Sequence, residues 1–388
     1  MSLTKEIQTT IQKALEYSSH FGNATFRWDP NERKLYLKDE YHFQRGMRLK
    51  LIILWSFGTL MMYETVTNPK IEGIVMKSQA SFTCAIVLMG GDMVRSTLNN
   101  YKTTMQSINE LVKLEMELEK DGNKLPKNKF AIVGILCKII FESAKSVCFA
   151  FGLPAVFMPE FPTNLFLSVD RFFPQADEKS IALIVIRRIL FGVGNVMIWY
   201  VIYTAALFLW LEMIFALTCM RGCLLMCLRK VCTKQPELTF GFYKRLSILV
   251  KKFNEAHSSV VVHMLATVAC VQSLAAFILL RAFRSNDEMP LIAIFCNLIA
   301  IINISTVILG VYGYAGKVYG TSISLIKSIV TNENVLRSRV GRRTAISFSS
   351  LQIKFGGSNF IDKRTPLVFL DFNIGRTVDL LLIDKRLV

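Results

Sequence analysis

The chain has 388 residues and a formal net charge of +17, with 52% hydrophobic and only 19% charged residues. Soluble domains carry about 25% charged residues, so this composition excludes an ordinary soluble multidomain protein. The Lys and Arg residues lie between apolar runs rather than in one stripe, which argues against a nucleic-acid-binding surface. The composition therefore predicts an integral membrane protein, with the lipid bilayer and no nucleic acid among its partners.

Six apolar runs follow one another along the chain, and each is long enough to cross about 30 Å of hydrocarbon as an α-helix. The residues before Leu49 are polar and contain no signal-peptide h-region, so we expect the first run to act as a signal anchor. The second run is the weakest, because it ends in Gly90, Gly91 and Asp92. The predicted spans are 49–66, 78–94, 131–158, 189–220, 263–283 and 291–316.

The basic residues between these runs predict which side of the membrane each loop faces. Successive segments, from the N-terminus to the one after the sixth span, hold nine, two, seven, four, eight, one and six Lys and Arg residues. High and low counts alternate, as the positive-inside rule requires when the N-terminus is cytoplasmic. The counts therefore predict a multi-pass protein with its N-terminus in the cytoplasm.

Residues 366–383 form a seventh candidate span, although each central charge costs about 2.5–3.5 kcal/mol on an insertion scale. Within it, Asp371, Gly375 and Asp379 are spaced i, i+4 and i+8 and form one helical stripe. Several copies around a water-filled axis would hydrate this stripe, and rings of carboxylates would favour cations. Two alternatives stay open: Arg376 neutralises one Asp within the helix, or the segment lies at the membrane interface. A seventh crossing would place the C-terminus outside the cell.

Three polar segments on the predicted cytoplasmic side, 101–120, 237–262 and 317–337, have apolar residues at helical spacing. We expect them to form a packed layer, the alternative being separate solvated helices. The predicted architecture is an all-α integral membrane protein with seven transmembrane helices, an extracellular C-terminus and a helical cytoplasmic anchor layer. Its parts are a cytoplasmic N-terminal region (1–48), a six-helix bundle (49–316) with helical extensions (95–130 and 221–262), an anchor helix with a connector (317–365) and a final pore-type helix with a tail (366–388).

Residues that could carry out chemistry are few. The sequence contains no phosphate-binding loop, no H-E-x-x-H zinc motif and no G-x-S-x-G elbow. It has four His residues, and we expect the two that flank the fifth span, His257 and His263, to be solvated or interfacial. We therefore predict no enzyme activity, no catalytic residue, no metal site and no cofactor.

All nine Cys residues lie in apolar spans or in one basic loop, so extracellular disulfides are not expected. Four of them form a series at the end of the fourth span: Cys219, Cys223, Cys227 and Cys232. Small packing residues are the favoured interpretation, with juxtamembrane palmitoylation and a distorted zinc site as alternatives.

Three ionisable residues share one helical face in the third span, namely Lys138, Glu142 and Lys145. Charged groups within a span usually face the bundle interior or water and mark a functional site. Pairing within the helix is an equally weighted alternative, because i,i+3 and i,i+4 contacts form easily.

The end of the chain resembles the closing segment of arthropod gustatory and odorant receptors. Residues 350–362 (SLQIKFGGSNFID) form an aromatic- and glycine-containing connector, and residues 364–368 (RTPLV) lead into a short, relatively polar final helix, as in that family. The helix continues through residues 372–382 (FNIGRTVDLLL). Here Val378 follows the Thr where gustatory receptors have Tyr, and the closing Gln-Phe is absent, so the chain resembles a divergent member.

The resemblance implies a chemosensory receptor that is a ligand-gated, non-selective cation channel of the plasma membrane, built as a homo- or hetero-tetramer. The final helices would line a central pore, and the cytoplasmic ends of spans four to seven would anchor the subunits to one another. A small organic ligand, a tastant or an odorant, would bind in the outer half of each bundle. The implied pore-lining residues are Asp371, Gly375, Val378, Asp379 and Leu382.

Aromatic residues at the corresponding depth are the ligand-binding candidates, because aromatic side chains suit small apolar ligands. The candidates are Phe149, Phe151, Phe191, Trp199, Phe277 and Phe295. In any helical bundle such residues more often fill the core or face lipid, and that alternative stays open.

Two other classes of membrane protein remain as alternatives. A seven-span G-protein-coupled receptor would need an extracellular N-terminus, against the loop counts, and no Asp-Arg-Tyr follows the third span. A small-solute transporter would be indicated by an inverted repeat or by paired Gly/Pro-broken spans, and the sequence has neither.

Overall fold

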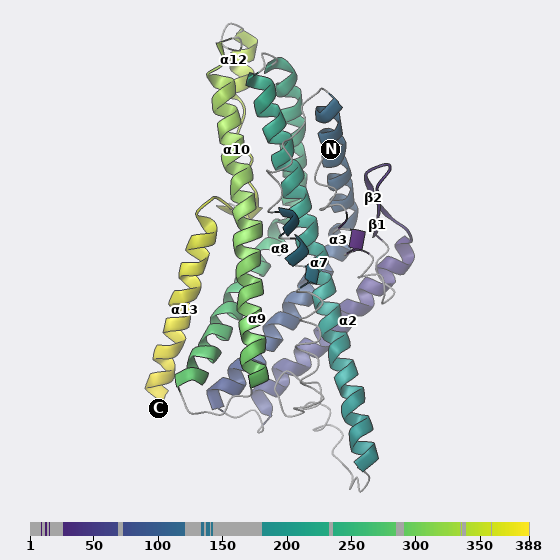
Figure 1. The fold of residues 1–388 in the computed structure, drawn as a ribbon, viewed down its shortest axis with the longest axis vertical. Coiled ribbons are helices and arrows are strands. Elements are labelled where there is room, and N and C mark those ends of the chain that lie inside the picture. The colour runs from purple at the N-terminus through teal and green to yellow at the C-terminus, as the bar shows by residue number, and fades with distance from the viewer. Residues whose placement is uncertain are drawn as a thin grey trace.

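The computed structural model describes residues 26–68, 73–120, 181–232, 236–284, 291–333, 339–357 and 359–387, with a few residues in 9–15 and 133–142 and residue 335. Its long helices run side by side in an elongated bundle (Figure 1). In chain order they are α2 (Glu40–Thr67), α3 (Gly73–Lys120), α7 (Ile181–Cys232), α8 (Pro236–Arg284), α9 (Leu291–Val307), α10 (Gly313–Val330), α12 (Arg339–Ile346) and α13 (Thr365–Leu387). A π-helical turn, η2 (Ile308–Tyr312), joins α9 to α10 without a break.

Four helices in the described part of the chain are long and apolar enough to cross a membrane: Glu40–Thr67, Arg188–Val231, Thr239–Arg284 and Ile294–Val330. They contain the first, fourth and fifth predicted spans and all of the sixth except its first three residues. The second and seventh predicted spans lie within α3 and α13, and most of the third lies outside the described residues. The all-α class predicted from the sequence is confirmed, apart from two small β-hairpins.

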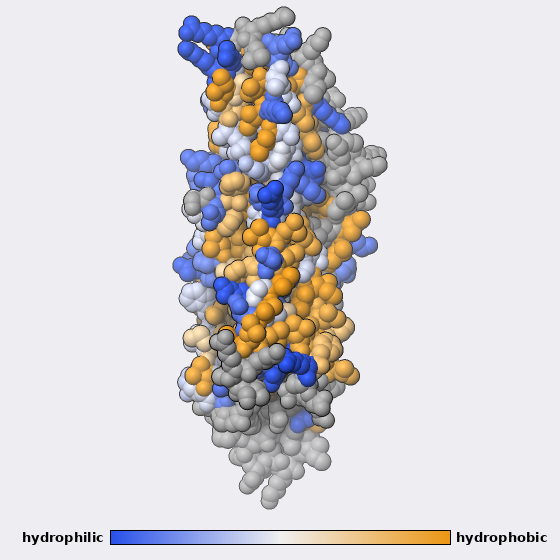
Figure 2. Space-filling view, turned by 90° about the vertical axis from the view of Figure 1, so that its left-hand side faces the viewer, coloured by the Kyte–Doolittle hydropathy of each residue, from blue (hydrophilic) through white to orange (hydrophobic). Residues whose placement is uncertain are grey.

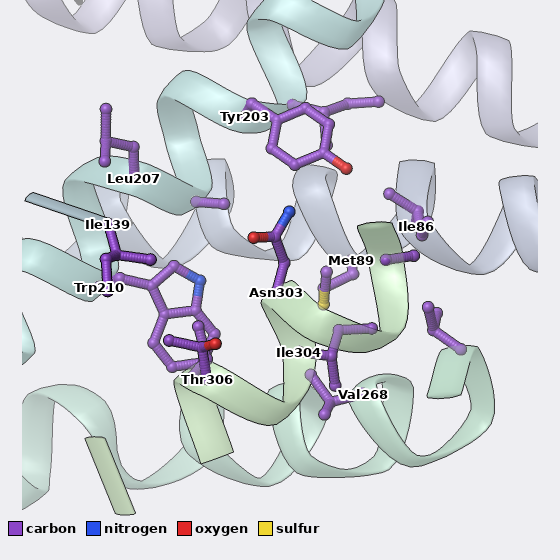
Figure 3. Close-up of a pocket in the computed structure, with 15 residues that line it drawn as sticks. Ile86, Met89, Ile139, Tyr203, Leu207, Trp210, Val268, Asn303, Ile304 and Thr306 are labelled. Atoms are coloured by element: carbon purple, nitrogen blue, oxygen red, sulfur yellow. The ribbon is translucent and has the colours of Figure 1, made fainter. Parts of the chain in front are cut away.

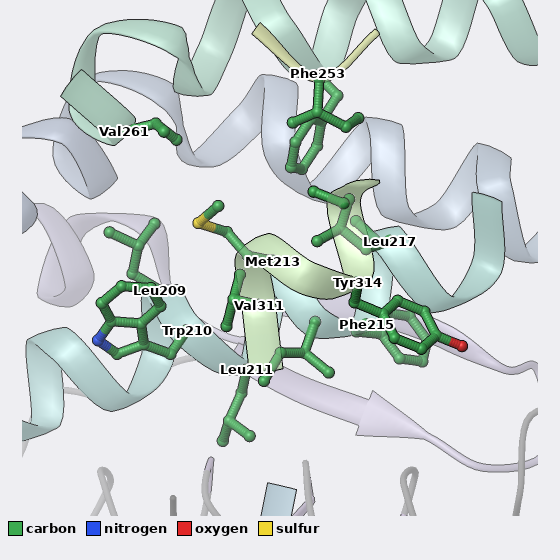
Figure 4. Close-up of a cluster of buried hydrophobic side chains, with 14 of the residues drawn as sticks. Leu209, Trp210, Leu211, Met213, Phe215, Leu217, Phe253, Val261, Val311 and Tyr314 are labelled. Carbon is green, nitrogen blue, oxygen red and sulfur yellow. The ribbon is translucent and has the colours of Figure 1, made fainter. Parts of the chain in front are cut away.

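α7 lies at the centre of the bundle, because its sequence is apolar on every side. All residues from 209 to 220 (LWLEMIFALTCM) are buried, which is the pattern of a helix surrounded by other helices. Figure 4 shows its side chains, among them Trp210, together with Phe253 of α8 and Val311 of η2. α7 therefore provides the core on which α3, α8 and α10 pack.

Three of the cysteines of α7 are packing residues. Cys219, Cys223 and Cys227 carry free thiols and are buried, so these three are not accessible to a lipid-transferring enzyme. Among the residues that the structure describes, no three His, Cys, Asp or Glu side chains are placed to hold a metal ion. The side chain of Cys232, the fourth member of the series, lies outside the described residues.

The expectation that His257 is solvated is wrong. Its side chain is buried, and its Nε2 lies 2.7 Å from Oε1 of Glu212 on α7. A carboxyl group in the apolar centre of α7 needs a hydrogen-bonding partner when it is buried, and His257 supplies one from α8. His263, two turns further along α8, is exposed as expected.

The helical layer expected on the cytoplasmic side is packed rather than made of separate solvated helices. The second half of α3 lies against the first half of α8. Leu111 and Leu114 of α3 and Leu246 of α8 are fully buried there. At the edge of this contact, Nη1 of Arg245 lies 2.6 Å from Oε2 of Glu117.

An N-terminal β-hairpin, absent from the sequence prediction, covers this layer. β1 (Phe26–Asp29) pairs antiparallel with β2 (Lys34–Leu37). Trp28 packs edge-on against Phe215 of α7, with ring centroids 5.5 Å apart. The side-chain amide of Asn109 on α3 accepts from the N–H of Leu35 at 2.8 Å and donates to its carbonyl at 2.9 Å. The outer edge of β2 is thus paired by a side chain.

The connector before α13 is fixed to α8 in the same way. Nδ2 of Asn254 donates to the carbonyl of Gln352 at 2.8 Å, and its Oδ1 accepts from the N–H of Lys354 at 3.0 Å. The connector then turns between β3 (Lys354–Phe355) and β4 (Asn359–Phe360), where Gly356 has φ +68°, a left-handed conformation that favours glycine. These contacts determine where α13 begins.

Candidate ligand cavity and final helix

A cavity of about 100 Å³ lies between α3, α7, α8 and α9 (Figure 3). The helices leave space at this level because small side chains stand on two of them, Ala206 on α7 and Ala300 on α9. The other lining residues are Ile86, Met89, Ile139, Ile202, Tyr203, Leu207, Trp210, Val268, Val271, Asn303, Ile304, Thr306 and Val307. Apart from three side chains, this lining is apolar.

The polar side chains of the cavity are Tyr203, Asn303 and Thr306. The Thr306 hydroxyl donates to the carbonyl of Ile302 in its own helix at 2.8 Å. Figure 3 shows the Asn303 amide rising from α9 toward the ring of Tyr203. Such a lining suits a small, largely apolar molecule with a single hydrogen-bonding group. An apolar cavity of about 150 Å³ takes up benzene, so this cavity is somewhat smaller than one that holds a single small ring.

The aromatic residues chosen from depth in the sequence do not line this cavity where the structure describes them. Phe149 and Phe151 lie outside the described residues, as does the side chain of Phe191. Phe277 is fully buried in the packing of α8, whereas Phe295 is 59% exposed on α9. Ligand contacts of these residues stay a prediction.

Trp199 lies behind the cavity rather than in its wall. It is fully buried, and its ring stacks on that of Tyr203, which does line the cavity, with centroids 6.0 Å apart. Sequence reasoning missed Asn303, although it is a polar residue in the apolar run 291–307 (LIAIFCNLIAIINISTV). Polar groups in such a run usually face the bundle interior, and that signal could have identified it.

α13 lies at one edge of the bundle and packs mainly on α8 (Figure 1). Its buried residues recur at intervals of seven, four and seven: Pro366, Asn373, Thr377 and Asp384. The predicted pore-lining residues are all exposed: Asp371, Gly375, Val378, Asp379 and Leu382. At about 100° per residue the two sets lie on roughly opposite faces. Figure 2 views the molecule from this side and shows hydrophilic side chains among hydrophobic ones.

Among the side chains that the structure describes, two ion pairs involve α13. Nη1 of Arg376 lies 3.3 Å from Oδ2 of Asp379, so the intrahelical pairing considered as an alternative is present. Both side chains are more than half exposed, and such pairs stabilise a helix only slightly. Near the C-terminus, Arg281 of α8 forms an ion pair with the buried Asp384 and ties that end of α13 to the bundle. The pore-lining roles themselves stay a prediction.

The N-terminus of α13 is capped by Asp362. Its Oδ1 accepts from the N–H of Arg364 at 2.9 Å and of Thr365 at 2.7 Å, and Oγ1 of Thr365 accepts from the N–H of Asp362 at 2.9 Å. The Thr365 hydroxyl and these N–H groups hold the pKa of the Asp362 carboxyl below its usual value. The cap is therefore charged at neutral pH and favours the positive end of the helix dipole.

The charged face expected in the third span is described only in part. Lys138 and Glu142 are exposed, and Lys145 lies outside the described residues. Both interpretations of this face stay open.

The fold is similar to that of solved receptor structures. Over 97% of this chain and 98% of the other, it matches the insect olfactory receptor OR5 from Machilis hrabei in complex with eugenol, with a TM-score of 0.70 and 12% sequence identity. A second structure of that receptor matches over 98% and 97% of the chains, with a TM-score of 0.58 and 14% identity. No protein-family model matches the sequence, and no curated protein matches it. The resemblance seen at the end of the sequence is thus confirmed for the fold: the chain is an all-α membrane protein with the fold of the insect olfactory receptors.

Proposed function

We propose that the chain is a divergent member of the insect odorant and gustatory receptor superfamily and a subunit of a ligand-gated, non-selective cation channel. Four subunits, identical or mixed, would surround a pore lined by α13. The observation that carries this proposal is the exposed face of α13, which bears Asp371 and Asp379 opposite the side packed on α8. Carboxylates on a helix at membrane depth are unfavourable in lipid, whereas a shared aqueous axis hydrates them and lets them attract cations.

The proposed ligand is a small organic odorant or tastant that enters the cavity between α3, α7, α8 and α9. Two observations support it: the lining is apolar with few polar groups, and a receptor of similar fold has been solved in complex with eugenol. Asn303 and Tyr203 are the side chains that would receive the polar group of such a ligand.

The proposed topology places the N-terminus in the cytoplasm and the C-terminus outside, in the plasma membrane. In Figure 1 the end of α8, the start of α9 and the end of α13 lie at one end of the bundle. The end of α7, the start of α8 and α12 lie at the other. This separation supports the alternation that the basic residues predict.

Electrical recording tests the proposal. Cells that express the full chain, alone or with a co-receptor subunit, are exposed to eugenol and to a panel of one-ring alcohols, phenols and esters. We expect an inward cation current, and Asp379→Asn should lower its calcium-to-sodium permeability ratio, because rings of carboxylates attract divalent cations. Glu255→Gln, at an exposed site on α8, is the matched control and should leave the ratio unchanged.

One outcome would contradict only the pore role of Asp379, and two would contradict the channel. An unchanged permeability ratio in a conducting Asp379→Asn variant would remove this residue from the pore. A response that requires a G protein would favour a G-protein-coupled receptor, and solute uptake without current would favour a transporter.

A further inference from the structure

Three polar side chains, two of them buried, join α13 to α8 and α9. Nδ2 of Asn373 donates to Oε1 of Gln272 at 2.6 Å, and Nε2 of Gln272 donates to Oγ of Ser305 at 3.0 Å. One glutamine of α8 thus connects α13 with α9. Asn373 and Gln272 are only 3% and 8% exposed. These three side chains are called the amide bridge below.

A second set of contacts lies beside the amide bridge. Oγ of Ser273 donates to the carbonyl of Asn373 at 3.3 Å, and Oγ1 of Thr377 lies 2.9 Å from the same carbonyl. Ser273, Asn373 and Thr377 are all buried. A buried amide that loses its partner is strongly disfavoured where water is excluded. α13 therefore favours positions in which Asn373 keeps its bond to Gln272.

The amide bridge is one residue away from the cavity on both α8 and α9. Val271 precedes Gln272, while Ile304 and Thr306 flank Ser305, and all three of these neighbours line the cavity (Figure 3). A molecule that moves α8 and α9 apart at these side chains lengthens the gap that the Gln272–Ser305 bond spans. Hydrogen bonds weaken steeply with distance. The side chain of Gln272 then either shifts toward α9 and keeps its bond to Ser305, or stays with α8 and loses that bond.

The π-helical turn η2 lies between the cavity wall and α10. It begins directly after Val307, a residue of the cavity wall, and it also contacts α13. A π turn is a local expansion of the helix and is common at functional sites. η2 is therefore the point in the coupling proposed below at which the cavity-lining part of α9 would shift relative to α10.

We propose that Gln272 is a positioning residue that transmits occupancy of the cavity to α13 through the amide bridge, an inference that rests on the proposed channel function. Occupancy changes the spacing of α8 and α9, Gln272 follows, and its bond to Asn373 moves α13. The opposite face of α13 carries Asp371 and Asp379, so the same motion reaches the proposed pore. A ligand acts in this way only if its affinity differs between the conformations with the two spacings of α8 and α9.

The test uses the purified full-length protein and a fixed occupant of the cavity in place of an unidentified ligand. Ala300→Leu fills part of the cavity, and amide hydrogen exchange across residues 365–387 reports on α13. We expect exchange to change by about fivefold or more, the lower end of ordinary coupling between sites. Ala276→Leu, at a half-buried site on α8 outside the cavity lining, is the matched control and should leave α13 unchanged.

The second arm removes parts of the amide bridge. Ser305→Ala deletes only the contact to α9, so α13 exchange should be close to that of the parent, while the response to Ala300→Leu should be lost. Gln272→Leu should abolish the response as well. Exchanging the two amides, by Gln272→Asn together with Asn373→Gln, should restore part of the response to Ala300→Leu. Such a recovery would not be expected if the single variants acted only by lowering the overall stability.

Two results of the exchange measurement would overturn the inference. One is an Ala300→Leu response of α13 that is equal with and without the amide bridge, and the other is no response at all. The exchange measurement does not depend on a current. If α13 exchange responds to Ala300→Leu but the protein conducts no ions, only the channel proposal is contradicted. Ligand-evoked current that is unchanged by Ser305→Ala and Gln272→Leu would defeat the positioning role alone.

Discussion

At the scale of single residues, Gly316 of α10 lies where the connector crosses the helix at backbone distance. A Cβ atom there would lie 2.5 Å from the carbonyl oxygen of Asp362, whereas one at Gly320 would meet the flexible end of Lys363. We expect Gly316→Ala to lower the free energy of unfolding by about 1–3 kcal/mol, because backbone has to move. Gly320→Ala should be neutral or stabilise by up to about 1 kcal/mol. Thermal unfolding in one detergent compares the two, and equal melting temperatures would contradict the close approach.

Asp362 makes a second prediction at this scale. Its pKa is lowered, so its cap stabilises α13 fully above the ordinary pKa of an aspartate and is lost only as the pH falls through the lowered value. Protection of the first-turn amides of α13 should therefore stay constant between pH 8 and pH 6. Asp362→Ala should weaken that turn by about 1 kcal/mol, and Asp362→Asn by less, because an amide oxygen still accepts. Hydrogen exchange measures both, and a loss of protection between pH 8 and pH 6 would contradict the assignment.

At the scale of elements, the pair Glu212–His257 joins α7 to α8 inside the bundle. Both side chains are nearly inaccessible, at 5% and 4% exposure, and Nδ1 of the imidazole lies 3.0 Å from the carbonyl of Phe253. Replacing either residue by Leu should lower the free energy of unfolding by about 1–3 kcal/mol, because the other is left unsatisfied. The double variant should lose less than the sum of the single losses. Chemical denaturation of the four proteins gives the coupling, and additive losses would contradict a direct interaction.

The orientation of the helices could be predicted only in part from the sequence. In α13 the stripe of Asp371, Gly375 and Asp379 is exposed, but apolar residues of the helix are exposed as well and the buried Asn373 and Thr377 are polar, so the spacing alone does not show which side packs on α8. In α7 the stretch 199–211 (WYVIYTAALFLWL) is apolar or aromatic on nearly every side, so periodicity predicts a helix but not the face that lines the cavity. For that reason depth alone selected Trp199 instead of its neighbour Tyr203.

Contacts between distant parts of the chain could not be predicted. The bonds from Gln272 to Asn373 and from Glu212 to His257 depend on how whole helices are arranged, and the residues they join are 101 and 45 positions apart. The N-terminal hairpin had a local signal, since residues 29–31 (DPN) favour a turn between two short alternating segments. Its strands are only four residues long, too short for periodicity to indicate them in a polar segment.

At the scale of the whole molecule, the central claim is that the exposed face of α13 is completed by other copies of the chain. In a single subunit surrounded by lipid, α13 would expose Asp371, Arg376 and Asp379 at membrane depth. This exposure is unfavourable unless water or another protein chain reaches these side chains. A closed symmetric ring of subunits would bring the same face of each α13 to one axis.

An experimental structure of the full-length protein, purified in a mild detergent or a lipid nanodisc, tests this claim most directly. The proposal predicts four subunits with α13 of each around a common axis, Asp371 and Asp379 toward that axis, and the packed stripe of α13 on α8 of its own subunit. A monomer, or an oligomer in which the exposed face of α13 points to lipid, would contradict it.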